Sequence, residues 1–182
     1  MNTQCETSRL SIRILTAREA PLVQSFYERN LYDFSKYEPL PAAEARTLGF
    51  HERCLDYEQK AYEQGKMVRF FFFLKDNPMQ VIGTVSYRNI RRAFYGCCEV
   101  GYKMDAAYRG RGLATEGIGF TNAIVQKEYD LHRIEALVMP DNTPSIRLLE
   151  GLGFQREGRL RDKLCLKGVW YDHFMYSKIY NN

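Results

Sequence analysis

Histidine and cysteine, which hold most protein metal sites, are few in this sequence and poorly spaced for one. His51, His132 and His173 lie far apart, and no Ser/His/Asp arrangement includes them. The five cysteines contain no Cys-x-x-Cys pair, and their odd number does not suit a disulfide framework. We therefore expect no metal. His132 should pack at the start of a strand, and His173 should be a solvated hairpin residue.

Long apolar runs and a strong excess of one charge are also missing. No segment resembles a signal peptide, and none approaches membrane-spanning length. The 26 Lys and Arg residues are scattered among 22 Asp and Glu residues, without a basic cluster interleaved with aromatics. We expect a cytoplasmic protein without direct membrane or nucleic-acid contacts. Its net charge of +4 would suit a bound polyanion such as coenzyme A.

The composition that remains is that of an ordinary globular protein. Apolar residues make up 45% and charged residues 26%, and no internal repeat or linker divides the chain. A length of 182 residues fits one domain with a substantial core, so we assign residues 1–182 to a single domain. Cys97 and Cys98 should point to opposite faces of a strand as small buried residues.

Hydrophobic periodicity and turn residues predict eleven elements. Alternation over 10–15 indicates a strand, and Thr16 with Glu19 forms a capping box before the first helix. Residues 30–40 are aromatic but aperiodic, which favours an ordered loop. The predicted strands are 10–15, 68–74, 80–90, 95–104, 133–139, 155–167 and 170–179, and the predicted helices are 17–29, 42–64, 113–129 and 144–151.

The order of these elements predicts a mixed sheet. The strand–helix–strand unit over 97–139 must place its two strands side by side and parallel. The remaining connections favour antiparallel pairs, with helices on both faces, so the fold class is α/β (α+β). In such folds ligands gather at the carboxyl end of the parallel strands.

A glycine-containing turn, Tyr108–Glu116, lies at that end and opens the helix 113–129. Backbone amides of Gly110, Gly112 and Ala114, with Arg109 and Arg111 beside them, would attract a diphosphate. The spacing Arg-x-x-Gly-x-Ala differs from that of dinucleotide folds and P-loops. The alternative is a tight turn whose glycines only permit positive φ.

Three segments give this pattern a family resemblance. Glu99–Met104 with Arg109–Ala114 resembles the acetyl-CoA-binding motif of the GNAT acetyltransferases, and Asn142–Phe154 resembles their second motif. Gly168–Tyr176 is similar to the ribosomal-protein N-terminal acetyltransferases of the Rim group. The resemblance covers almost the whole chain and is weakest over 30–66. It implies a GNAT fold whose central parallel strands splay apart.

The resemblance implies acetyl-CoA as the cosubstrate. Main-chain groups of Lys103 and Met104 would bind its pantetheine arm, as an added strand would. Asn142 would contact the cofactor, unless it serves only as a helix N-cap. The diphosphate would be held by the turn residues Arg109, Gly110, Arg111, Gly112, Ala114 and Thr115.

The resemblance also assigns candidate catalytic residues. Ser145 would lie near the leaving thiolate, and Leu149 stands where many family members have an acidic tyrosine. Protonation of the thiolate would then fall to Ser145, to another tyrosine or to water. Glu157 and Glu99 are the two candidates for the base, although either could be a surface residue or an ion-pair partner.

The resemblance implies a primary amine as the acceptor, and the Rim-type tail favours the N-terminus of a ribosomal or another protein. Small-molecule amines such as polyamines, amino sugars or antibiotics remain as alternatives, as do a non-catalytic acyl-CoA sensor and a nucleic-acid-binding protein. We expect a monomer or a homodimer. The acceptor site should be walled by aromatic residues, which could equally be lids on the core: Tyr32, Phe34, Tyr37, Trp170 and Tyr171.

Overall fold

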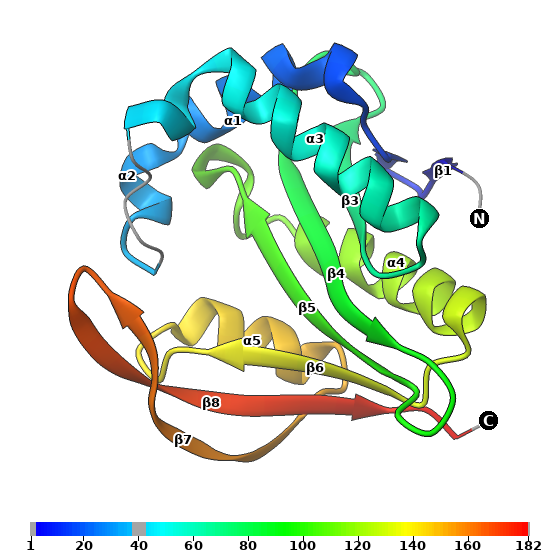
Figure 1. Cartoon of the computed structure of the whole chain (residues 1–182), viewed down its shortest axis with the longest axis vertical. Helices are drawn as coiled ribbons and strands as arrows, with labels where there is room; N and C mark the ends of the chain where they lie inside the picture. Colours follow the sequence, from blue (N-terminus) through cyan, green and yellow to red (C-terminus); the bar gives the residue numbers. More distant parts are fainter. Residues whose placement is uncertain (1–2, 38–42, 182) are drawn as a thin grey trace.

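The computed structural model describes residues 3–37 and 43–181, which build one eight-stranded sheet in the order β1-β2-β3-β4-β5-β6-β8-β7 (Figure 1). The strands are β1 (Gln4–Glu6), β2 (Leu10–Arg13), β3 (Val68–Leu74), β4 (Gly83–Arg91), β5 (Cys97–Met104), β6 (Arg133–Val138), β7 (Gln155–Leu166) and β8 (Val169–Ile179). The helices are α1 (Ala20–Arg29), α2 (Leu31–Phe34), α3 (Leu48–Glu63), α4 (Leu113–Tyr129) and α5 (Thr143–Gly151). Short 3-10 turns lie at Ala17–Glu19, Ala43–Arg46 and Ala106–Tyr108.

The run of four phenylalanines in β3 shows why the sheet lies in the middle of the molecule. Phe70 and Phe72 point into the core beneath α4, whereas Phe71 and Phe73 point into the core beneath α1 and α3. All four side chains are buried. Side chains alternate along a strand, so a strand that is apolar at every position needs cover on both faces. Helices accordingly lie on both faces of the sheet, as predicted (Figure 1).

One strand pair, β5 with β6, is parallel, and its pairing is short. Only Cys97, Cys98 and Glu99 face partners in β6, at residues 133–135. Beyond these pairs the two strands diverge: β5 stays paired with β4, and β6 stays paired with β8 (Figure 1). The fold therefore has the splayed central pair that the family resemblance implied. Cys97 and Cys98 are both buried, as expected.

Several predicted boundaries need correction. The helix expected over 42–64 begins at Leu48, because Thr47 caps it by accepting a hydrogen bond from Phe50 N. Part of the expected loop 30–40 is the short helix α2. The strand expected over 80–90 starts at Gly83, and β1 was not predicted at all. The parts of these predictions that fall on residues 38–42 lie outside the described residues.

Two histidines differ from expectation. His132 precedes β6 with an exposed side chain, whereas His173 in β8 is buried, with Nδ1 3.1 Å from the Tyr171 carbonyl oxygen. The predicted capping box at Thr16 and Glu19 is present. Within residues 3–37 and 43–181, no helix combines the length and apolar character needed to cross a membrane.

Candidate active site

The turn that joins β5 to α4 contains two glycines with left-handed backbone. Gly110 and Gly112 adopt φ values of 73° and 74°, in the left-handed region that favours glycine. Gly112 is the N-cap of α4, whose first amides have no partner within the helix. A Cβ built on Gly110 would meet no atom within 4 Å, so open space lies beside this backbone.

A carboxylate fixes this turn to the N-terminal strands. Glu116 Oε1 accepts hydrogen bonds from Thr7 Oγ1 at 2.6 Å, Ser8 Oγ at 2.9 Å and Arg9 N at 2.9 Å. Arg9 Nε donates to Glu116 Oε2 at 2.6 Å, and Arg9 Nη1 donates to the Arg111 carbonyl oxygen at 2.8 Å. Burial alone would raise the pKa of Glu116, but these hydrogen bonds hold it at about 2. No sequence pattern predicted this contact, because its residues lie more than 100 positions apart in the chain.

The two turn arginines are arranged differently. Arg109 Nε donates to the Met104 carbonyl oxygen at 3.2 Å, and its Nη1 lies 3.2 Å from Asp33 Oδ1 in α2. Arg109 therefore ties the turn to the end of β5 and to α2. Arg111 is exposed, with its guanidinium 5.4 Å from the ring centre of Tyr108. Gly112 and Thr115 are exposed as well, while Ala114 is half-buried.

The divergent strands bring one unexpected pair of residues together. Tyr102 in β5 places its phenol oxygen 2.7 Å from Ser145 Oγ in α5. The same phenol donates to the Ser145 carbonyl oxygen at 3.3 Å. Tyr102 belongs to the first family motif, but nothing in the spacing of the sequence pointed to this contact, because only the tertiary fold brings β5 and α5 together.

Residues of the second motif lie at the start of α5. Asn142 is the N-cap, and its Oδ1 accepts from Ser145 N at 3.3 Å. This side chain thus has the capping role that the sequence left open. Leu149 is buried in the core and carries no acidic group. Lys103 and Met104 pair with Thr84 and Gly83 of β4, beyond the last pair between β5 and β6.

The two candidate bases differ in their surroundings. Glu157 in β7 accepts hydrogen bonds from both terminal nitrogens of Arg133 and, at 2.6 Å, from Ser177 Oγ. Hydrogen bonds from Arg133 and then Ser177 outweigh burial and hold the pKa of Glu157 at about 2. Glu99 lies at the last pair between β5 and β6, and its Oε1 accepts from Asn89 Nδ2 at 3.0 Å.

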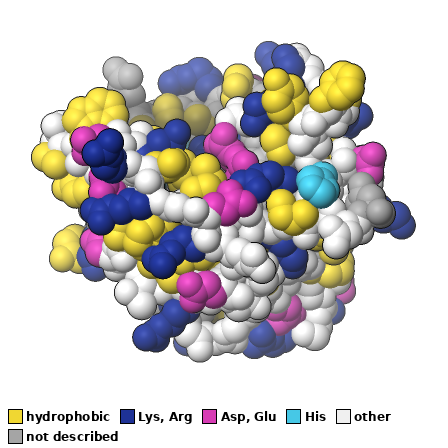
Figure 2. Space-filling model, turned by 90° about the horizontal axis from the view of Figure 1, so that it is seen from below, with side chains coloured by type: hydrophobic (Ala, Val, Ile, Leu, Met, Phe, Trp, Pro, Cys, Tyr) yellow, Lys and Arg dark blue, Asp and Glu magenta, His cyan; other side chains and the backbone are white. Residues whose placement is uncertain are grey.

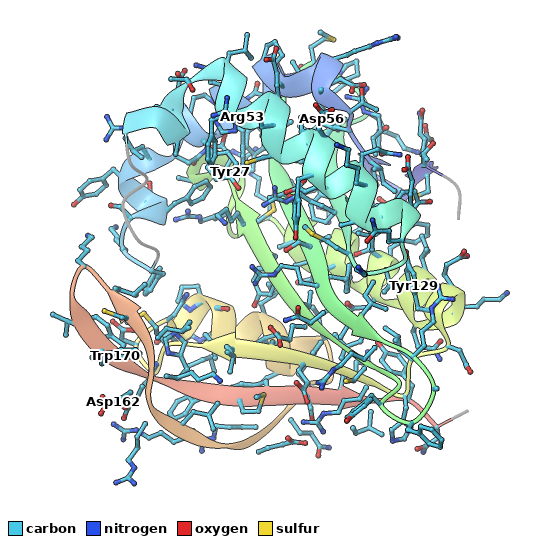
Figure 3. All side chains as sticks on the ribbon, viewed as in Figure 1. Tyr27, Arg53, Asp56, Tyr129, Asp162 and Trp170 are labelled. Carbon is cyan, nitrogen blue, oxygen red and sulfur yellow. The ribbon has the colours of Figure 1, made fainter. Side chains whose placement is uncertain are left out.

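The aromatic residues expected around the acceptor lie in two regions. Phe34 is half-buried in α2, and Tyr32 beside it is 78% exposed. Trp170 is 60% exposed on the β7–β8 hairpin, with Tyr171 next to it. Figure 3 shows Trp170 on this hairpin, while Tyr27 points from α1 toward the sheet. Tyr37 is also exposed, so of these five only Phe34 has a mainly packed position.

Comparison with known proteins identifies the family to which this fold and this site belong. The profile of the family described as "Acetyltransferase (GNAT) domain" matches residues 9–155, which is well over half of the chain. The protein belongs to the GNAT acetyltransferase family.

Its relatives include acetyltransferases of ribosomal proteins. The ribosomal protein uS5-alanine N-acetyltransferase of Escherichia coli is 30% identical over 93% of this chain and 87% of that protein. A probable N-acetyltransferase of Bacillus subtilis, YjcK, is 32% identical over 89% of each chain. The crystal structure of the ribosomal-protein-S5-alanine acetyltransferase of Vibrio fischeri superimposes with a TM-score of 0.92, at 29% identity over 98% of this chain and 97% of that one. The protein is therefore an N-acetyltransferase close to the Rim type.

Proposed function

We propose that this protein transfers the acetyl group of acetyl-CoA to the N-terminal amine of a protein, and that a ribosomal protein is the acceptor. The observation that carries the proposal is the divergence of β5 from β6, with the left-handed glycine turn at one side and the Tyr102–Ser145 contact across it. The similarity to uS5-alanine acetyltransferases over nearly the full chain supports the choice of acceptor.

In this proposal the turn binds the coenzyme A diphosphate through the amides of Gly110, Gly112 and Ala114, with Arg109, Arg111 and Thr115 around them. The open space beside Gly110 fits such a role, because a phosphate oxygen must approach the backbone closely. Main-chain groups of Lys103 and Met104 bind the pantetheine arm as a neighbouring strand would. Asn142 acts mainly by holding the start of α5.

The acceptor nitrogen attacks the thioester carbonyl carbon directly, the new N–C bond forms and the C–S bond breaks. Glu157 or Glu99 accepts the proton that the nitrogen loses, either directly or through water. The Ser145 hydroxyl donates a hydrogen bond to the departing sulfur, which is reprotonated through Ser145 or water. Tyr102 keeps the Ser145 hydroxyl in place. Positioning of the two substrates supplies much of the rate.

The test is thiol release from acetyl-CoA with a panel of amines, combined with mass measurement of the acceptor. A peptide with the N-terminal sequence of uS5, beginning with alanine, should gain one acetyl group at its N-terminus. A peptide whose amine is blocked is the control and should release no thiol. Acetylation of polyamines or amino sugars in preference to every peptide would contradict the proposed acceptor.

The main rival is a sensor that binds acyl-CoA without turnover, and the leucine at 149 is the observation in its favour. The same thiol-release assay distinguishes the sensor from the acetyltransferase. Calorimetric binding of coenzyme A, together with no thiol release from any amine, would support the sensor. Turnover with any peptide excludes it.

A further inference from the structure

A cavity of about 310 Å³ lies between α1, α2 and α3, over β3. All of its lining residues come from positions 23–69, so it is built apart from the acetyl-CoA turn and from α5. A dry cavity of about 150 Å³ is enough to hold benzene. The volume here would therefore accept one substituted aromatic ring.

Aromatic rings form much of the wall of this cavity. Tyr27 and His51 stack with their ring centres 5.4 Å apart and their planes at 26°. Phe34 meets Tyr27 edge-on at 5.9 Å, and Phe50 packs against His51 at 5.6 Å. Rings arranged in this way favour another aromatic ring as the occupant.

Three buried polar atoms lie among these rings without a hydrogen-bond partner in the described part of the chain. Arg69 uses Nη1 to pair with Glu58 Oε1 at 2.5 Å and Nη2 to donate to the Tyr27 hydroxyl at 3.2 Å. Arg69 Nε, Glu58 Oε2 and His51 Nε2 remain unpartnered. His51 is only 4% exposed. Buried polar atoms almost always find partners, so these three call for a ligand or ordered water.

The chemistry of these atoms restricts the ligand. Arg69 Nε is a donor and Glu58 Oε2 is an acceptor, and one hydroxyl group can bond to both. Glu58 and Arg69 already neutralise one another, and the two other charged residues of the lining, Glu28 and Arg46, are exposed and of opposite sign. Burial, followed by the Arg69 charge, lowers the pKa of His51 against the opposing charge of Glu28, which favours the neutral imidazole. A charged ligand would leave an unpaired charge in an apolar cavity, which is costly.

We propose that this cavity is a binding site for a small uncharged aromatic molecule that carries a hydroxyl group. Its ring packs against Tyr27 and Phe34, and its hydroxyl bonds to Glu58 and Arg69. Lys103 of β5 lies beside the aromatic wall, with its Nζ 5.6 Å from the Tyr27 ring centre and 6.0 Å from that of Phe34. The site is separate from the acetyl-transfer chemistry proposed above.

The first test uses Cys54, which lines the cavity, as a reporter, with phenol as the probe. Cys165 in β7 is exposed and serves as the internal control. Phenol at about ten times its Kd should slow labelling of Cys54 by a thiol reagent about tenfold, because only the empty cavity reacts. Labelling of Cys165 should not change, and benzoate and benzylammonium should protect neither residue.

A pair of variants provides a second test, read by calorimetry of phenol binding. Cys54→Phe fills the cavity and should abolish binding, whereas Cys54→Ala leaves it open and should retain binding. Coenzyme A affinity should be the same in both, which separates this site from the proposed function. The absence of Cys54 protection at saturating phenol in the unmodified protein would show that the cavity holds only water. Equal protection by the charged probes would contradict the proposal of an uncharged ligand.

Discussion

Tyr102 and Ser145 are in hydrogen-bond contact at 2.7 Å although they belong to β5 and α5, on either side of the divergent strands. Burial raises the pKa of Tyr102 to about 12, against the opposing effect of the Ser145 hydrogen bond. The phenol therefore keeps its proton at neutral pH and can donate it to Ser145. In the mechanism proposed above, this hydrogen points to Ser145 Oγ instead of the Ser145 carbonyl oxygen, so that the Ser145 hydroxyl hydrogen is available to the departing sulfur. The pair would then replace the tyrosine that is missing at Leu149.

Replacement of Tyr102 by phenylalanine should lower kcat about tenfold and change the KM for acetyl-CoA less than about twofold, because the hydroxyl acts on the leaving group. Steady-state kinetics at several pH values would measure both constants. Ser145→Ala should show the same pattern. Tyr57→Phe is the matched control, since Tyr57 is 69% exposed on α3. A lower melting temperature with unchanged kcat would mean that the contact only stabilises the fold.

The sequence predicted most of the fold because its signals are local. The capping box at Thr16 and the predicted strands 68–74, 155–167 and 170–179 each depend on neighbouring residues, and all are present to within one residue at each end. The start of α3 was wrong because the preceding residues are also compatible with helix, while the Thr47 cap sets the actual boundary.

The sequence predicted less of the site. The turn glycines could be found because left-handed backbone has a sequence signature. The Tyr102–Ser145 contact and the ion pair between Arg9 and Glu116 could not be predicted from the sequence. Each joins residues that are far apart in the chain and that meet only in the tertiary fold. An ion pair was one of the alternatives left open for Glu157, but the sequence did not identify Arg133 as its partner.

The turn glycines provide a second prediction. Gly112→Ala places a Cβ on backbone with φ of 74°, which costs about 1–2 kcal/mol unless the turn changes shape. A changed turn no longer directs its amides to one point, so coenzyme A should bind at least about tenfold more weakly. Calorimetry would measure the affinity. Gly151→Ala, where a Cβ meets nothing within 4 Å, should bind normally. Unchanged affinity in Gly112→Ala would contradict the location of the diphosphate site.

The hydrogen bonds and ion pair of Glu116 predict that the stability of the protein depends on pH. The pKa of this carboxyl is about 2 in the folded protein and near 4.5 in the unfolded chain. The ionised carboxylate therefore stabilises the folded state at pH values above 4.5. The contribution should be complete above about pH 5.5 and lost as the pH falls toward 2, with a size of about 1–3 kcal/mol. Glu116→Gln should remove this part of the dependence. Urea unfolding between pH 3 and 7 would measure it, with exposed Glu52→Gln as the control.

Close packing of α4 on the sheet predicts a stability difference between two glycine variants. A Cβ on Gly117 would lie 2.8 Å from Phe72 Cζ and 3.1 Å from Leu10 Cδ1, both in fully buried side chains. Gly117→Ala should therefore lower the free energy of unfolding by about 1–3 kcal/mol. Gly151→Ala, which meets open space in α5, should be neutral or stabilising. Thermal unfolding of the two variants would compare them directly; equal melting temperatures would disprove the steric argument.

The choice of base gives the last prediction. Because the pKa of Glu157 is about 2, its carboxylate is ionised at every pH near neutrality. It is too weak a base to keep the amine proton, so its proposed role is to orient the water that takes this proton. We expect Glu157→Gln to lower kcat about 100-fold between pH 6 and 9 and Glu99→Gln to change it little. Removal of the Arg133 hydrogen bonds by Arg133→Gln should raise the pKa of Glu157. The fall in rate on acidification should then begin at a higher pH than in the unmodified protein. A large loss in Glu99→Gln alone would transfer the role to Glu99, and normal rates in both variants would leave proton removal to water.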